Sequence, residues 1–334
     1  MAAFLKQRGL ASAPETATDT TTSPSHPEFI IFRGELVPYD QARVHVLSTA
    51  MKFSTIVFEG LRGYWNADHG ELYCFRLTDH FVRLTQTMKI ARIPGPNDPE
   101  WYASRLLDLV RANHLRSDVH MRVQVFVDAE DGPLVATEPV AVCMATTPRG
   151  RFTESTGLNV GVSSWIRIAD KSMPPRVKAV ANYHNSRLAA MQARLDGYDD
   201  AVLLTSDGRV AEGPGYNLFM VRSGRLVTPP ITEGILEGIT RDSLIAIARE
   251  TLNLEVVERP IDRTELYVAN ELFFCGSAAE VVPILSVDHH TIGTGVPGRL
   301  TLLLRDEYLA TARGMVPSRS EWLTPTYGDS SIAT

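Results

Sequence analysis

The chain has 334 residues, of which 44% are hydrophobic and 22% are charged, and its formal net charge is -6. This length suits about two domains with a sizeable core, and the composition is ordinary for a globular protein. The negative charge and the lack of a Lys/Arg cluster argue against nucleic-acid binding. Charged residues, Gly or Pro interrupt each apolar stretch before it is long enough to span a membrane.

The first 27 residues differ in kind from the rest. Residues 1–12 are mildly basic and amphipathic, and an Ala/Thr/Ser/Pro stretch without a packing pattern follows. We expect residues 1–27 to form a disordered N-terminal arm, because Glu15 and Asp19 stand where transit peptides avoid acids. Organellar targeting by this arm stays open as an alternative.

The three cysteines indicate the cellular compartment of the protein more than its chemistry. Cys74, Cys143 and Cys275 lie far apart in the sequence, each in an apolar run. Their spacing supports neither a disulfide framework nor a metal cluster. We therefore expect a cytoplasmic protein.

The first structured part mixes strands with two helices, which predicts a small α/β domain over residues 28–147. A turn at Arg33-Gly34 closes the first hairpin, and a second turn lies at residues 68–70. The predicted elements are a hairpin over 29–37, strands over 56–64 and 72–76, helices over 78–89 and 100–113, and strands over 121–127 and 140–145.

A polar break with Pro148 and Gly150 follows, and we expect residues 148–153 to be an interdomain linker. A larger domain is expected over 154–327 and a flexible tail over 328–334. No internal repeat is present, which argues against a solenoid or propeller. The predicted elements are strands over 158–164, 200–205, 209–212, 217–221, 271–275 and 281–287, and helices over 186–195, 240–252 and 299–312.

Lys178 and Glu212 are the pair that points most directly to chemistry. Lys178 stands in the segment Arg-Val-Lys-Ala-Val-Ala-Asn-Tyr, and Glu212 opens a later glycine-rich turn. An amine can form a Schiff base with an aldehyde cofactor, and a carboxylate beside a pyridinium nitrogen keeps such a ring protonated and able to draw electrons. Each residue alone has an ordinary explanation, as a solvated charge or a turn residue.

Two small polar turns offer the donors of a phosphate site. Ile239 and Thr240 precede a predicted helix, which places free N–H groups and a hydroxyl at a helix N-terminus. Ser277 adds a hydroxyl in the turn over 276–280. Taken singly, a threonine N-cap and a plain turn explain these features equally well.

Taken in order, seven segments resemble the fold-type IV pyridoxal phosphate (PLP) aminotransferases, most closely the branched-chain amino acid aminotransferases. The resemblance implies an α/β (α+β) fold with a smaller N-terminal domain, a larger C-terminal domain and the cofactor between them. It also implies a homodimer or higher homo-oligomer, because in this family a loop of the neighbouring subunit enters the site. The seven segments are residues 57–62, 80–84, 163–165, 178–183, 212–219, 238–242 and 276–280.

By this resemblance, seven residues bind the cofactor. Lys178 looks like the Schiff-base lysine, which also moves the proton between substrate and cofactor, and Glu212 matches the acid on the pyridine nitrogen. Tyr183 matches the phenol that hydrogen-bonds the phenolate oxygen of the cofactor. Arg83 resembles the phosphate-binding arginine, because its planar donors suit a phosphate. The rest of the phosphate site is Ile239, Thr240 and Ser277.

The substrate side is less regular. Arg122 matches an arginine that helps to accept acidic substrates, which favours glutamate as a partner. Phe53 stands where a tyrosine is usual, Tyr216 replaces a frequent acid, and residues 128–134 are shorter than the interdomain loop of the family. Core packing is the alternative explanation for the aromatic residues. The expected substrate residues are Phe53, Phe58, Arg62, Arg122, Trp165, Ala278 and Ala279.

The resemblance implies an aminotransferase that exchanges an amino group between a hydrophobic, branched-chain-like L-amino acid and 2-oxoglutarate by a ping-pong mechanism. Arg62 and Arg122 favour this activity. Tyr216 and the ending over 323–327 leave open an (R)-selective amine or D-amino acid transaminase. Aminodeoxychorismate lyase and a non-catalytic PLP-binding protein are further alternatives. His289-His290 lies in a turn, so we expect no metal.

Overall fold

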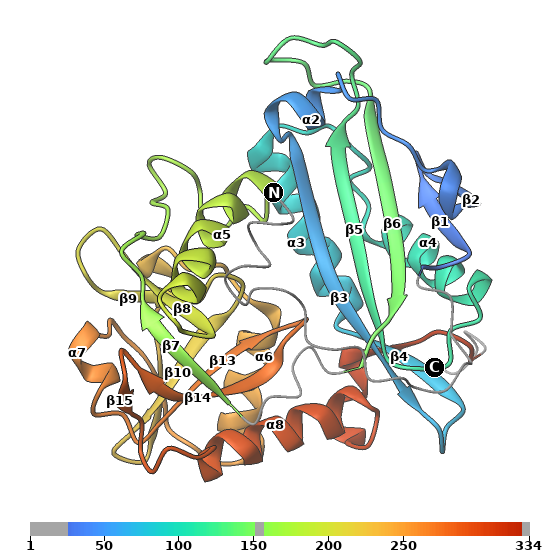
Figure 1. Ribbon diagram of the computed structural model, residues 1–334. Helices are drawn as coiled ribbons and strands as arrows, with labels where there is room; N and C mark the ends of the chain where they lie inside the picture. Colours follow the sequence, from blue (N-terminus) through green and yellow to red (C-terminus); the bar gives the residue numbers. More distant parts are fainter. Residues whose placement is uncertain (1–25, 151–156, 329–334) are drawn as a thin grey trace, which may run out of the picture.

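The computed structural model describes residues 26–150 and 157–328, which form two β-sheets with helices packed on them. Figure 1 shows the sheets beside each other, the first with long strands at residues coloured blue and green and the second in yellow to orange. Nearly all of the expected arm and tail, and half of the expected linker, lie outside these ranges. The domain bounds therefore stay a prediction.

The first sheet is antiparallel throughout and is centred on β3 and β5. In β5, buried and half-buried residues alternate, because one face of the sheet packs on helices and the other faces a cavity. In spatial order the strands are β16 (Leu323–Pro325), β4 (Glu71–Phe75), β3 (Ile56–Asn66), β5 (Val119–Val127), β6 (Val140–Pro148), β1 (Phe29–Phe32) and β2 (Glu35–Pro38).

Helices α3 (Leu77–Ala91) and α4 (Pro99–Ala112) supply the core of this part. Buried residues on both helices recur at intervals of three and four and pack with β3 and β5 in one hydrophobic cluster. Asp98 caps α4 by accepting a hydrogen bond from the backbone of Glu100, with Pro99 at the first helical position. The short helix α2 (Thr49–Phe53) and the 3-10 turn η1 (Tyr39–Gln41) precede β3.

The second sheet is mixed, with parallel pairs at β7–β8, β7–β14 and β11–β12. Its central strands are buried on both faces, since Leu244 and Leu304 pack in a cluster on one side and Ile261 and Leu266 in a cluster on the other. The strands in spatial order are β12 (Val256–Glu258), β11 (Arg225–Thr228), β10 (Asn217–Arg222), β13 (Glu271–Gly276), β14 (Glu280–Val287), β7 (Leu158–Val162), β8 (Asp200–Leu204) and β9 (Val210–Glu212), with β15 (His290–Thr291) paired to β14.

The helices of this part agree with the predicted ones except at the start of α5 and at the short α7, which was not predicted. Asn182 donates hydrogen bonds to the carbonyls of Pro174 and Val177, and this tertiary contact fixes a first turn that the periodicity does not reveal. The helices are α5 (Val180–Leu195), α6 (Ile239–Ala246) continuing into the π-helical η3 (Ile247–Thr251), α7 (Arg263–Leu266) and α8 (Arg299–Ala312), with 3-10 turns η2 (Ile231–Glu233) and η4 (Pro317–Trp322).

The two sheets do not each take one continuous stretch of chain. After α8 the chain returns to the first sheet, where β16 pairs with β4. The turn at Asp288-His289, between β14 and β15, has positive φ at both residues, as a tight hairpin requires. Within residues 26–150 and 157–328, no helix has the length and apolar character to cross a membrane, and no group of side chains could hold a metal ion.

Candidate active site

A cavity of about 230 Å³ lies between the two sheets. Strands β3 and β5 supply one wall, and α5, the start of α6 and the turns after β9 and β13 supply the others. All seven residues that the resemblance assigns to the cofactor line this cavity: Lys178, Arg83, Tyr183, Glu212, Ile239, Thr240 and Ser277. The sequence prediction thus selects side chains that the fold brings together.

Lys178 is held where α5 approaches the edge of β3. Its carbonyl accepts a hydrogen bond of 2.9 Å from the backbone N–H of Phe58, and the next residue forms a β-bridge with Val57. The side-chain Nζ lies 2.7 Å from the hydroxyl of Tyr183 and 4.9 Å from the centre of the Phe58 ring. The amine is therefore half-buried, with a single hydroxyl partner.

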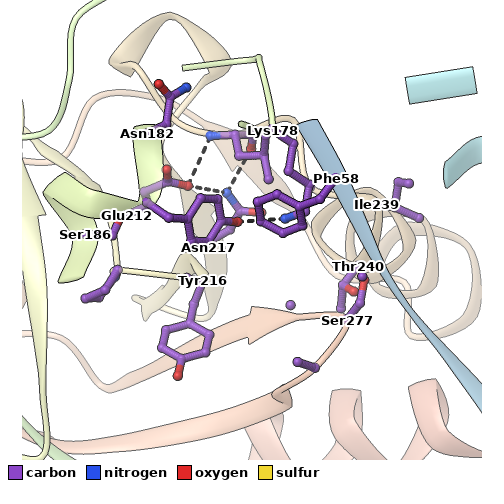
Figure 2. A pocket seen from close by; sticks show the side chains of 18 of the residues that line it. Phe58, Lys178, Asn182, Ser186, Glu212, Tyr216, Asn217, Ile239, Thr240 and Ser277 are labelled. Atoms are coloured by element: carbon purple, nitrogen blue, oxygen red, sulfur yellow. Dashed lines mark hydrogen bonds between the residues drawn. The ribbon is translucent and has the colours of Figure 1, made fainter. Parts of the chain in front are cut away.

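Glu212 stands at the end of β9 and is 4% exposed. Its carboxylate lies 2.8 Å from the guanidinium of Arg167 and accepts hydrogen bonds from Asn217 (2.9 Å) and from the N–H of Leu236 (3.1 Å). Burial raises the pKa of Glu212 above its ordinary value, although Arg167 opposes the shift. Figure 2 shows Lys178, Glu212 and Asn217 around one space.

The start of α6 supplies open backbone donors. Its N-cap residue is Gly238, and no side chain caps the helix, so the first N–H groups are free to bind an anion. Thr240 is buried beside them, and Ser277 lies in the turn between β13 and β14 (Figure 2). A Cβ atom at Gly238 would collide with the amide oxygen of Asn217. Glycine is thus required here as long as Asn217 holds Glu212.

Arg83 projects from α3 into the cavity wall, and Glu59 of β3 fixes its direction. Nε and Nη2 of Arg83 bind both oxygens of Glu59 at 2.8 and 2.7 Å, and Nη1 donates to the carbonyl of Glu237 at 2.8 Å. His80 Nδ1 contacts the same carboxylate at 2.8 Å. Burial alone would raise the pKa of Glu59, but Arg83 and His80 outweigh it and hold the pKa well below its usual range.

Of the expected substrate residues, Phe58, Arg122 and Ala278 line the cavity. Residues Phe58 and Gly60 share one face of β3, and Arg122 pairs with Gly60 in the neighbouring strand. The guanidinium of Arg122 lies 3.9 Å from the centre of the Phe58 ring, and burial lowers its pKa. In the described ranges Arg122 forms no ion pair, which leaves its charge available to a ligand.

Four expected substrate residues lie outside the cavity wall: Phe53, Arg62, Trp165 and Ala279. The side chain of Arg62 is 1% exposed and donates to the carbonyls of Arg149 and Gly150, so it holds the end of β6 in place. Phe53 and Trp165 are 40% and 44% exposed. The alternative of core packing is therefore wrong for both aromatic residues.

The sequence did not single out several residues that build the site. Arg167 carries no local signal, since its partner Glu212 lies on a distant strand. Asn217 and Glu59 stand inside segments that were matched as a whole, so only their individual roles were missed. His120 also lines the cavity; burial, with Arg149 and Arg62 as lesser causes, lowers its pKa to about 4, which makes it neutral near pH 7.

The chain matches the Amino-transferase class IV family over residues 56–287. It belongs to this family. Among its relatives is the probable branched-chain-amino-acid aminotransferase of Aquifex aeolicus, which is 36% identical over 302 residues, 90% of this chain and 97% of that protein. The branched-chain-amino-acid aminotransferase of Salmonella typhimurium is 37% identical over 305 residues, 89% of this chain and 97% of that protein.

Solved structures agree with these relatives. The branched-chain amino acid aminotransferase of Thermobaculum terrenum in its PLP-form superimposes with a TM-score of 0.86 at 42% identity, covering 91% of this chain and all of that one. The branched-chain aminotransferase of Thermoproteus uzoniensis with norvaline gives a TM-score of 0.86 at 38% identity, covering 90% of this chain and all of that one. The expected fold of a fold-type IV PLP enzyme is confirmed.

Proposed function

We propose that this class IV aminotransferase is a PLP-dependent enzyme that transfers an amino group from a hydrophobic, branched-chain-like L-amino acid to 2-oxoglutarate. The observation that carries the proposal is the combination of functional groups that line one cavity. The Lys178 amine, the buried Glu212 carboxylate and the open N-terminus of α6 face the same space. The names of the relatives support the choice of substrate.

The residues present suit the cofactor on physical grounds. A phosphate needs N–H donors and a cation, which the start of α6 and Arg83 provide. A pyridine nitrogen needs a buried acid, and Arg167 and Asn217 hold Glu212 for it. The requirement for glycine at position 238 keeps the cradle open to the backbone donors.

When bound, PLP supplies an aldehyde that condenses with amines and a pyridinium ring that accepts electrons from the substrate α-carbon. The chain provides the proton transfers and the orientation. Lys178 Nζ accepts and returns a proton, and the Tyr183 hydroxyl at 2.7 Å directs the amine. Glu212 holds a proton against the ring nitrogen, and Arg167 stabilises its carboxylate against burial.

The remaining residues of the cavity wall determine which substrates bind. Phe58 and Ala278 offer apolar surface for a branched side chain. Arg122, stacked on Phe58, offers a cation for the distal carboxylate of 2-oxoglutarate or glutamate. One pocket can then accept both substrates of a ping-pong exchange: the branched side chain lies against the Phe58 ring, and the distal carboxylate lies against the Arg122 guanidinium.

We further propose a homodimer or larger homo-oligomer. The hydrogen bonds of Thr49 with Ala129 and of Asp131 with Leu47 join two segments into one surface. That surface presents Val46, Met51, Leu134 and Val135, which are between 60% and 82% exposed. Exposed apolar side chains on one surface favour a protein partner. The three free cysteines favour the cytosol as the compartment.

The test is a comparison of amino donors with purified protein. Incubation with PLP should give a yellow protein, and borohydride followed by mass spectrometry should place the cofactor mass on the peptide with Lys178; Lys178→Ala should lose both signals. L-leucine with 2-oxoglutarate should then yield glutamate, whereas D-alanine and (R)-1-phenylethylamine should not. A colourless protein would contradict the cofactor proposal, and turnover of only the two other donors would contradict the substrate proposal.

A further inference from the structure

A second hollow, of about 440 Å³, continues the active-site cavity outward along α5. The two spaces share much of their lining, so a ligand in the cavity could extend into the outer groove without crossing a wall. The shared residues are Phe58, Arg122, Tyr183, Ser186, Pro214, Gly215 and Tyr216. The outer groove adds residues of its own, among them Arg187 and Arg194.

One face of α5 forms the side of this groove. Tyr183, Arg187, Ala190 and Arg194 follow at intervals of three and four, so they lie on one stripe of the helix. At 1.5 Å of rise per residue, Arg187 stands about 6 Å and Arg194 about 16 Å beyond Tyr183. The small side chain of Ala190 leaves space between the two arginines.

The charges in the groove are unbalanced at Arg187. Arg194 lies near Asp200, whose carboxylate is also hydrogen-bonded by Tyr216, so those two charges offset each other. Arg187 forms no hydrogen bond or ion pair with any residue of the described ranges. An exposed arginine is ordinarily a solvated charge, but this one borders a groove that opens into the reaction site.

We propose that Arg187 is a specificity-determining residue that binds the distal carboxylate of 2-oxo dicarboxylic acids longer than 2-oxoglutarate. Arg122 lines the inner cavity, where a short dicarboxylate ends, whereas Arg187 lines only the outer groove. A chain with one or more additional methylenes would therefore pass Arg122 and meet Arg187. The inference rests on the proposed aminotransferase function and extends its range of acceptors.

The experiment compares two acceptors of equal chain length, with L-leucine as donor. 2-Oxoadipate and 2-oxohexanoate both have six carbons, and only 2-oxoadipate carries a terminal carboxylate. Arg187→Leu should lower kcat/KM for 2-oxoadipate about fivefold, near the upper end for a solvent-exposed ion pair, and leave 2-oxohexanoate within twofold. Arg187→Lys should retain most of the activity with 2-oxoadipate. Arg105→Leu, at an exposed position of α4, controls for the change in net charge.

Equal losses for both acceptors, or no selective loss, would overturn the inference while leaving the proposed function intact. If the wild-type enzyme converts no 2-oxo acid, the proposed function itself fails. Calorimetric titration of the PLP-loaded protein with adipate and hexanoate gives a readout without turnover. Wild-type protein should bind adipate more tightly, and Arg187→Leu should remove that preference; unchanged adipate affinity in the variant would again count against Arg187.

Discussion

Glu59→Gln tests whether the buried carboxylate at position 59 holds the phosphate side of the active site. Glu59 is fully buried and makes three short contacts, two to Arg83 at 2.8 and 2.7 Å and one to His80 at 2.8 Å. The glutamine keeps the shape but removes the negative charge. Arg83, whose side chain is only 11% exposed, is then left without a counter-ion.

Removing one partner of a buried ion pair typically costs about 3 kcal/mol or more. A change of this size lowers the thermal midpoint of a chain this long by roughly 4 °C or more. The free guanidinium is also less well oriented, so the affinity for PLP should fall about tenfold. Differential scanning calorimetry of the cofactor-free protein measures the first effect, and a spectroscopic titration with PLP measures the second.

The double variant Glu59→Gln/Arg83→Met separates charge from shape. It removes both charges, so its loss of stability should be smaller than the sum of the two single losses by at least about 1 kcal/mol. Asp306→Asn, which breaks the exposed pair with Arg305, serves as the control and should change stability by about 0.5 kcal/mol or less. A Glu59→Gln midpoint within one degree of wild type, or strictly additive losses, would refute the reasoning.

Three further changes probe other residues of the cavity. Burial raises the pKa of Glu212 above 4.5, so the folded chain holds more protons than the unfolded chain above that pH, and the stability of the protein falls as pH rises. Arg167→Met removes the opposing cation and should steepen this fall of stability with pH in urea titrations between about pH 5 and pH 8. An unchanged dependence of stability on pH would contradict the pairing of Arg167 with Glu212. Gly238→Ala should weaken PLP binding about tenfold in a fluorescence titration, because the new methyl group displaces Asn217; wild-type affinity would show that the contact relaxes freely. Tyr183→Phe removes the hydroxyl partner of Lys178 and should lower kcat about tenfold in steady-state assays with L-leucine and 2-oxoglutarate, whereas an effect on KM alone would argue against a role in proton transfer.

The sequence was most informative where a function is encoded in a short segment. Lys178 lies two residues before α5 and Tyr183 lies in its first turn, and Ile239 and Thr240 are adjacent, so the proximity of each pair follows from local geometry. The pairing of Arg167 with Glu212 could not be predicted in this way. It depends on two segments that meet only after the second sheet has formed.

The predictions of secondary structure likewise succeeded where the sequence pattern is long and regular and failed where it is short. Helix α8 has the predicted bounds because its apolar periodicity is long and regular. The short strands β11 and β12 were missed, since three or four residues hold too little pattern to reveal a strand. The position of Arg62 could not be predicted for another reason: its side chain reaches the carbonyls of Arg149 and Gly150, which follow a different strand, and it does not line the cavity.

The cofactor side and the substrate side of this cavity are held by different forces. Glu59 and Arg167 fix Arg83 and Glu212 through buried ion pairs, in which the loss of one partner leaves an uncompensated charge. Arg122 and Arg187 have no such partner in the residues described. A substitution on the substrate side therefore costs little stability, whereas one on the cofactor side costs several kcal/mol. The range of substrates can thus change by single substitutions while the chemistry at Lys178 stays the same.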